Sequence, residues 1–124
     1  MPVHHILIVD DSRTEQAFLA DLLTDAGYAV RTASGGEEAL RLMDEVKPDL
    51  VLMDVVMPGA NGFSLTRQIT RDPRWTGIPV MLCTSKRQDS DRIWGLRQGA
   101  CDYLIKPVNG PELLSKIAAL QEHP

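Results

Sequence analysis

The chain has 124 residues and a mass of 13.7 kDa, which fits one domain with a single hydrophobic core. Hydrophobic residues make up 44% and charged residues 24%, and this globular composition excludes disordered, collagen-like and disulfide-scaffold classes. The net charge of −4 disfavours direct binding to nucleic acid, which needs a basic surface. We expect one domain over residues 1–124, with a core of about 4–121.

The sequence also indicates a compartment. It has no apolar run near the ~20 residues that a membrane span needs. Its N-terminus lacks the basic and apolar regions of a secretory signal. The two cysteines, Cys83 and Cys101, suit a reducing environment, where we expect both to be buried small hydrophobes. These features predict a cytoplasmic protein with no membrane-inserted segment.

Short apolar runs alternate with amphipathic stretches along the chain. The runs predict strands at 5–9, 28–32, 50–53, 79–83 and 103–105. The first, third and fourth are almost continuous in aliphatic residues and methionine, which is typical of parallel strands buried on both faces. The second run is more mixed, as expected for a strand at the edge of a sheet.

Between and after these runs, apolar residues recur at helical spacing. The helical sets are Phe18, Leu19, Leu22, Leu23 and Ala26; Ala39, Met43 and Val46; Leu65 and Ile69; Ile93 and Leu96; and Leu113, Ile117 and Leu120. The stretches 12–15 and 34–37 fit capping boxes, and Gly27 and Gly99 stand where the first and fourth helices should end. Residues 72–77 are expected to form a longer loop. Five β-α units predict an α/β three-layer sandwich with a parallel sheet and right-handed crossovers.

Polar side chains gather where the predicted strands end. These residues are Asp10 and Asp11 after the first strand, Asp54 after the third, Thr84 and Ser85 after the fourth, and Lys106 and Pro107 after the fifth. Ligands of open α/β sheets bind at this edge. Close carboxylates repel one another unless a cation lies between them, and oxygen ligands of this kind suit Mg²⁺. A carboxylate can also accept a phosphoryl group, and a lysine can pair with it. The set predicts phosphoryl transfer onto one aspartate.

A plainer interpretation exists for each residue alone. An aspartate or serine after a strand often serves only as a helix N-cap, which would suffice for Asp11 or Ser12. Lys106 alone would be an ordinary surface lysine. A dinucleotide site is excluded because the first strand is followed by Asp-Asp-Ser and not by a glycine-rich loop. The adjacent His4 and His5 point to opposite faces of a strand and are not expected to share a metal ion.

The motifs at 8–12, 52–62, 84–85 and 103–107 resemble the receiver domain of two-component response regulators. The resemblance covers essentially the whole chain, in matching order and spacing. It implies a flavodoxin-like fold with strand order 2-1-3-4-5. The stretches 66–80 and 93–103 look most like the stand-alone receivers of twitching-motility chemosensory systems.

The resemblance implies roles for the acidic residues. Asp54 would be the phospho-acceptor. Asp11 would hold Mg²⁺ directly, Asp10 largely through water, and Asp54 and the backbone carbonyl of Val56 would complete the metal site. The phosphoryl donor would be a sensor histidine kinase, with a CheA-like kinase as one candidate. The protein would then transfer phosphate only onto itself and would not be an enzyme acting on other substrates.

The resemblance also implies a switch. Thr84 would bond the phosphoryl group and move with it, and Tyr103 would be the aromatic residue that turns inward in response. Lys106 would pair with the phosphoryl group, and the Lys106–Pro107 peptide bond would be cis. Output would be altered affinity for a protein partner, or withdrawal of phosphate from another receiver.

Two surface features are open to more than one interpretation. Trp94, Arg97 and Tyr103 could form an aromatic and basic partner face, or be a partly buried tryptophan among solvated charges. Val56 and Lys86 would flank the path of a hydrolytic water, and because Val56 offers that water no hydrogen bond, we hypothesise that self-dephosphorylation is not unusually fast. The alternative is that both only fill surface space.

Two rival functions remain. One is a phosphohydrolase with an aspartate nucleophile, although such enzymes carry an Asp-x-Asp motif where this chain has Asp10-Asp11, and a cap domain does not fit in 124 residues. The other is a structural receiver that needs no phosphate, against which the complete set of acidic, hydroxyl and lysine residues argues.

Overall fold

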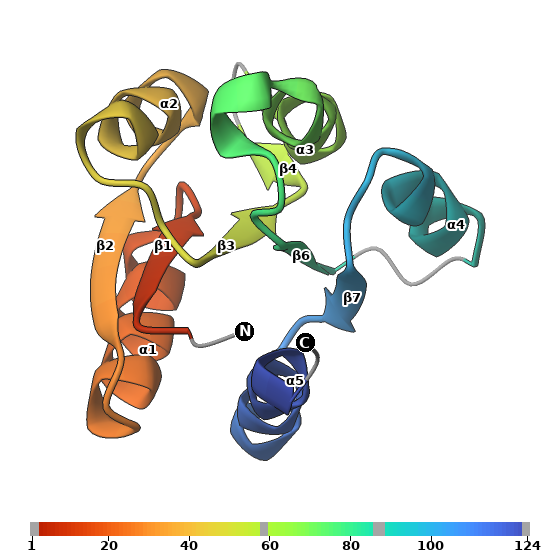
Figure 1. The fold of residues 1–124 in the computed structure, drawn as a ribbon. Helices are drawn as coiled ribbons and strands as arrows, with labels where there is room; N and C mark the ends of the chain where they lie inside the picture. Colours follow the sequence, from red (N-terminus) through yellow and green to blue (C-terminus); the bar gives the residue numbers. More distant parts are fainter. Residues whose placement is uncertain (1–2, 58–59, 86–88, 123–124) are drawn as a thin grey trace.

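The structure, a computed structural model, describes residues 3–57, 60–85 and 89–122 (Figure 1). Its central feature is a five-stranded parallel sheet with the order β2-β1-β3-β6-β7. The strands are β1 His5–Val9, β2 Ala29–Ala33, β3 Leu50–Asp54, β6 Val80–Thr84 and β7 Asp102–Ile105. Numbered within this sheet alone, the order is 2-1-3-4-5, so the predicted architecture is confirmed.

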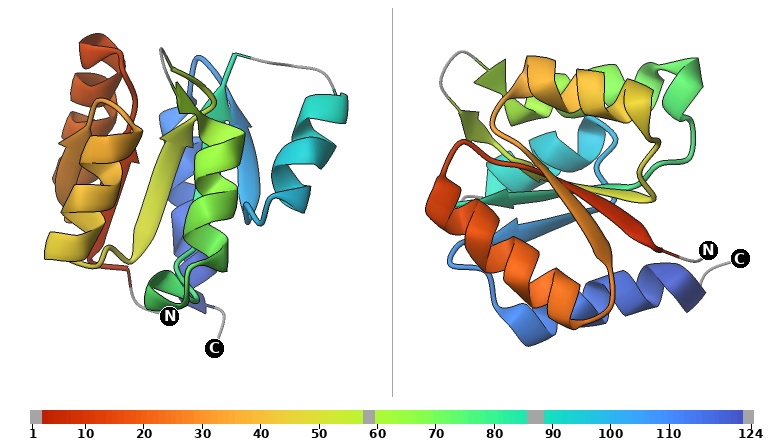
Figure 2. Two further views of the ribbon diagram at one scale, coloured as in Figure 1. Left: turned by 90° about the horizontal axis from the view of Figure 1, so that it is seen from above. Right: turned by 90° about the vertical axis from the view of Figure 1, so that its left-hand side faces the viewer.

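Helices cover both faces of the sheet (Figures 1 and 2). They are α1 Arg13–Asp25, α2 Gly36–Glu45, α3 Gly62–Arg71, α4 Asp89–Arg97 and α5 Gly110–Glu122. α1 and α5 lie on one face, and α2, α3 and α4 on the other. Each face has its own buried cluster: Ile6 and Ile8 of β1 pack on the first side and Leu7 and Val9 on the second. Because both faces are covered, β1 is apolar from Ile6 to Val9, as is typical of parallel strands buried on both sides.

Two connections contain structure that the sequence patterns did not predict. After β3, the short strands β4 Val56–Met57 and β5 Ala60–Asn61 pair in an antiparallel hairpin. The expected loop at 72–77 contains a 3-10 turn, η1 Pro73–Trp75, in which the Trp75 side chain is buried. Burial of this tryptophan attaches the loop to the core, so the segment is more than a spacer.

The predicted caps are confirmed only in part. Ser12 Oγ accepts a hydrogen bond from the Glu15 N–H at 3.3 Å, but the Ser12 N–H donates to Asp10 Oδ1 and not to Glu15. The second capping box is wrong. α2 is capped by Gly35, and the Ser34 N–H donates to Glu38 Oε1 at 2.6 Å. Neither motif therefore forms the reciprocal pair of a capping box, although Ser12 does cap α1.

Some predicted helical faces are also wrong. Leu19 and Leu23 of α1 are buried as expected, but Phe18 is exposed. The α2 set ends one residue too late, because Val46 is the C-cap and is exposed.

The fourth helix departs most from its expected pattern. On α4, Ile93, Trp94 and Leu96 are exposed and Gly95 is buried. A Cβ on Gly95 would lie 2.5 Å from Leu82 Cδ1 and 3.1 Å from Phe63 Cε1, so the glycine lets α4 approach the sheet closely. None of the helices in the described ranges is long and apolar enough to cross a membrane.

Candidate functional site

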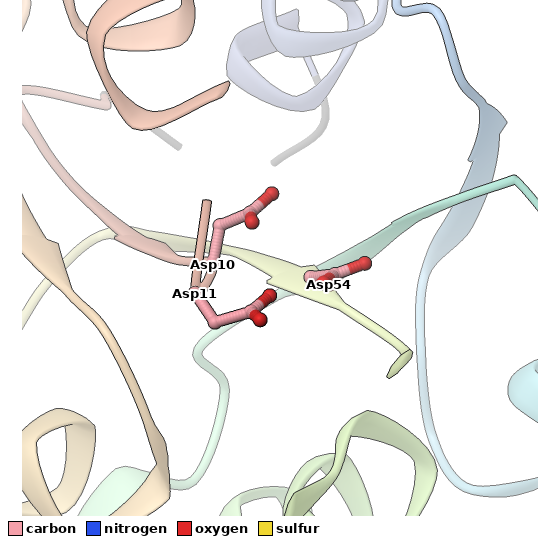
Figure 3. Close-up of side chains that lie close together, drawn as sticks. All are labelled: Asp10, Asp11 and Asp54. Carbon is pink, nitrogen blue, oxygen red and sulfur yellow. The ribbon is translucent and has the colours of Figure 1, made fainter. Parts of the chain in front are cut away.

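The predicted polar residues meet at one edge of the sheet. Asp10 follows β1, Asp54 and Thr84 are the last residues of β3 and β6, and Lys106 follows β7. Because these strands are parallel, their carboxyl ends lie along the same edge. Figure 3 shows the side chains of Asp10, Asp11 and Asp54 close together at the ends of β1 and β3.

Hydrogen bonds hold both the side chain and the backbone of Asp10. Its side chain is 2% exposed, Oδ1 accepts the Ser12 N–H at 2.9 Å, and Oδ2 accepts from Lys106 Nζ at 2.8 Å. Its own N–H donates to the Ala33 carbonyl of β2 at 3.0 Å. Asp11, the next residue, is exposed. The acidic pair therefore combines a rigid, buried carboxylate with one that faces solvent.

Asp54 lies beside the same lysine. Its side chain is only 8% exposed, and Oδ1 accepts from Lys106 Nζ at 3.3 Å. Burial raises the pKa of Asp54, and the nearby negative charge of Asp10 raises it further, while Lys106 opposes both effects. For Lys106, burial alone would lower the pKa, but its hydrogen bond to Asp10 and the charges of both aspartates raise it. Lys106 is thus held as a cation between two carboxylates.

The acidic cluster suits a divalent cation. Asp10, Asp11 and Asp54 each offer one carboxylate oxygen, and these oxygens all lie within 4.8 Å of one another. Lys106 forms ion pairs with Asp10 and Asp54, and Asp11 is the exposed member of the cluster. An oxygen-only set with an open side fits Mg²⁺, which binds through a few carboxylates and keeps other positions for water and phosphate.

The remaining residues of the predicted switch lie on β6 and β7. Thr84 is buried, and its carbonyl accepts the Lys106 N–H at 2.8 Å. The Lys106–Pro107 peptide bond is cis. Tyr103 is only 8% exposed and belongs to the buried cluster with Leu82 and Phe63. A surface patch of Trp94, Arg97 and Tyr103 is therefore not present as predicted, because the tyrosine lies inside.

Several other predictions have clear outcomes. Cys83 is buried, and burial raises the pKa of its thiol to about 12, as expected for an inert hydrophobe. Cys101 is exposed, which corrects the prediction that both cysteines are buried. Val56, two residues after Asp54, is 59% exposed, and Lys86 lies outside the described residues.

Two polar residues that no sequence pattern singled out contribute to this architecture. Gln16 of α1 contacts the backbone of Asp10, and Asp49 accepts both the His4 and His5 N–H groups at 2.9 Å. Both act on main-chain groups of distant segments, and such contacts have no local spacing signal.

The parallel sheet and the acidic site at its edge are together those of a receiver domain. The family model described as the response regulator receiver domain matches residues 6–118, which include all of the sheet except its first residue, His5, together with the acidic site. The chain belongs to this family.

Individual proteins of the family differ in how much of their length this chain covers. Protein PilH of Pseudomonas aeruginosa is 50% identical over 115 residues, which cover 93% of this chain and 95% of that protein. The chain covers only 50% of the transcriptional regulatory protein AfsQ1 of Streptomyces coelicolor, to which it is 38% identical.

Solved structures agree with this family membership. The chemotaxis protein CheY4 of Vibrio cholerae is 30% identical with a TM-score of 0.89, over 95% of this chain and 98% of that one. The BeF3-activated receiver domain of RstA from Klebsiella pneumoniae is also 30% identical with a TM-score of 0.89, over 97% of this chain and 100% of that one.

Proposed function

We propose that this receiver takes a phosphoryl group from a phosphohistidine of a sensor histidine kinase onto Asp54 and thereby switches a protein-binding surface. The observation that carries the proposal is the setting of Asp54, 3.3 Å from Lys106 Nζ and within 4.8 Å of the Asp10 and Asp11 carboxylates. An anionic nucleophile placed between an ammonium group and cation ligands is equipped to accept a phosphoryl group.

The proposed transfer balances without a further reactant. An Asp54 oxygen attacks phosphorus, the P–N bond of the phosphohistidine breaks as the new P–O bond forms, and the leaving imidazole takes up a proton from solvent. Hydrolysis later breaks the bond to Asp54, releases inorganic phosphate and restores the carboxylate. Transfer onto its own side chain makes this chain a regulator that acts on no other substrate.

The metal ligands are proposed from the resemblance to receiver domains, and the same geometry supports them. Asp11 would bind Mg²⁺ directly and Asp10 largely through water, with Asp54 and the Val56 carbonyl completing the site. When bound, the ion neutralises charge on the phosphoryl oxygens. Support comes from the cluster itself, because Asp10 is rigidly held by Ser12 and Lys106 while Asp11 is exposed.

The phosphoryl group would be read by Lys106, Thr84 and Tyr103. Lys106 Nζ already bridges Asp10 and Asp54, and Thr84 ends the strand beside β3. We propose that Thr84 moves to bond the phosphoryl group and that the position of Tyr103 follows this movement. The buried Tyr103 ring supports this proposal, because it lies beneath Gly95 of α4, the helix that carries the exposed Trp94 and Arg97.

For the output, we propose a type of signalling system and a partner surface. The likeness to PilH and to a chemotaxis protein supports a chemosensory system of the twitching or chemotaxis type, with a CheA-like kinase as donor. On α4, Trp94 is 51% exposed between Arg92 and Arg97, and this face is the proposed partner surface. A phosphate sink that drains another receiver is the alternative output.

Phosphorylation of the purified chain tests the proposal. With acetyl phosphate and MgCl₂, intact-mass measurement should show one added phosphoryl group on wild type and none on Asp54→Asn. Asp21→Asn, which changes an exposed carboxylate on α1, should label like wild type. Labelling of Asp54→Asn at the wild-type level would overturn the assignment of the acceptor.

The two rival functions predict different results with the same purified protein. A small-molecule phosphohydrolase would turn over p-nitrophenyl phosphate many times per protein molecule, whereas the proposed receiver should not. A structural receiver would give no labelled species with acetyl phosphate or with a phosphorylated kinase, and this outcome would overturn the phosphoryl-transfer proposal.

A further inference from the structure

Gln16, in the first turn of α1, links the acidic site to the neighbouring edge of the sheet. Its Nε2 donates to the Asp10 carbonyl oxygen, to Ser34 Oγ at 3.1 Å and, more weakly, to the Ala33 carbonyl at 3.4 Å. Two of these partners are carbonyl oxygens, which only accept hydrogen bonds, so the amide nitrogen must face them. The orientation of the Gln16 side chain is therefore set by its surroundings.

The Asp10 carbonyl has a particular importance because it belongs to the peptide group that joins Asp10 to Asp11. A peptide group is planar, so its oxygen and the Cα of the next residue cannot rotate independently. Fixing the Asp10 oxygen therefore fixes the direction in which the chain places Asp11. Asp11 itself is exposed and is not held by the contacts that hold the Asp10 carboxylate.

The partners of Gln16 at the end of β2 are themselves held by hydrogen bonds. Ser34, whose hydroxyl meets Gln16, donates its N–H to Glu38 Oε1 of α2 at 2.6 Å. The Ala33 carbonyl, which Gln16 approaches, also accepts the Asp10 N–H at 3.0 Å. Gln16 thus closes a network that joins β1, the start of α1, the end of β2 and the first turn of α2.

We propose that Gln16 is a positioning residue that presets the Asp10–Asp11 peptide for binding a divalent cation. The inference rests on the proposed function, because the cation in question is the Mg²⁺ of phosphoryl transfer. Gln16 touches neither the ion nor Asp54. It acts on cation affinity by removing the freedom of the turn that carries Asp11, as groups that orient metal ligands do.

The test compares Gln16→Met with a matched control. Methionine keeps the length and helix propensity of glutamine but has no donor. Gln98→Met removes an amide that donates to the Trp94 carbonyl at 3.4 Å on α4, away from the site. Isothermal titration of the full chain with MgCl₂ should give a dissociation constant about 10-fold higher for Gln16→Met. Gln98→Met should match wild type.

A second measurement separates positioning from general stability. In the metal-free protein, ¹⁵N relaxation should show a lower order parameter for the Asp11 N–H in Gln16→Met than in wild type or Gln98→Met. A lower melting temperature with unchanged Mg²⁺ affinity and an unchanged Asp11 N–H would overturn the inference and leave Gln16 a merely structural residue. Absence of Mg²⁺ binding by wild type would instead overturn the metal site of the proposed function, and the inference with it.

Discussion

At the residue scale, the chemistry of the site depends on one lysine shared by two buried aspartates. Lys106 Nζ lies 2.8 Å from Asp10 Oδ2 and 3.3 Å from Asp54 Oδ1, so its charge is divided between the rigid carboxylate and the proposed nucleophile. A phosphoryl group on Asp54 would add negative charge beside the same ammonium group. The contact with Asp10 holds the ammonium in place before that charge arrives.

Val56 allows a prediction about the lifetime of the phosphorylated state. Its side chain is 59% exposed two residues after Asp54 and has no group that could hydrogen-bond an attacking water. Val56→Asn adds an amide that can orient such a water, so the phosphorylated protein should lose its phosphate several-fold faster. The decay of the phosphorylated mass after removal of acetyl phosphate measures this rate. An unchanged lifetime would show that this position only occupies surface.

At the scale of elements, hydrophobic periodicity predicted the strands of the main sheet and the α-helices, but it missed the β4–β5 hairpin and did not predict how each helix meets the sheet. The fourth helix illustrates the limit. Ile93 and Leu96 have helical spacing, yet both are exposed because α4 approaches the sheet through Gly95. Likewise, the 34–37 motif fits a capping box, but Ser34 instead contacts Gln16 and Glu38. Both outcomes depend on tertiary neighbours that a local pattern does not contain.

The start of β1 yields a prediction about pH. Asp49 Oδ2 accepts the N–H groups of His4 and His5, and so ties the entry of β3 to that of β1. Burial alone would raise the pKa of Asp49, but these hydrogen bonds outweigh it and lower the pKa. A lowered pKa means that the ionised carboxylate stabilises the fold above its ordinary pKa, and that this contribution is lost as the pH falls through the lowered value.

Asp49→Asn tests this contribution. Asparagine keeps an acceptor oxygen but has no charge. Urea unfolding at pH 7 should therefore show a free energy of unfolding lower by about 0.5–1 kcal/mol, a modest value because solvent screens the partly exposed carboxylate. The difference from wild type should shrink as the pH is lowered below 4. Asp21→Asn on α1 is the control. A difference that stays constant with pH would mean that the charge of Asp49 has no part in it.

At the scale of the whole molecule, the site was more predictable than the details of packing. Parallel strands place their carboxyl ends on one edge, so the residues alone predicted that Asp10, Asp54 and Lys106 share this edge, and the structure brings them together there. Burial of Tyr103, exposure of Cys101 and the role of Gln16 could not be predicted in this way. They depend on how side chains fill space between elements distant in sequence.

The acidic cluster should also make the stability of the whole fold depend on Mg²⁺. Bringing three carboxylates within 4.8 Å of one another costs stability, and a cation that binds only the folded state restores it. At a Mg²⁺ concentration tenfold above the dissociation constant, the gain is about 1.4 kcal/mol, which corresponds to a rise in Tm of roughly 5 °C for a domain of this size. Thermal unfolding with MgCl₂ and with EDTA measures the difference.

The variant Asp54→Asn tests whether the charge of Asp54 destabilises the fold when no cation is bound. The pKa of Asp54 is raised in the folded state, so its ionisation destabilises the fold, and stability is lost as the pH rises through the raised value. In EDTA at pH 7, Asp54→Asn should therefore melt above wild type, and the two should converge as the pH falls below the ordinary pKa of an aspartate, where Asp54 is neutral in the folded and the unfolded protein alike. In MgCl₂ the variant should gain less than wild type, because it has lost a ligand. An equal rise in melting temperature with MgCl₂ for both proteins would show that Asp54 is not a ligand of the cation. A variant that melts below wild type in EDTA would show that the charge of Asp54 does not destabilise the fold.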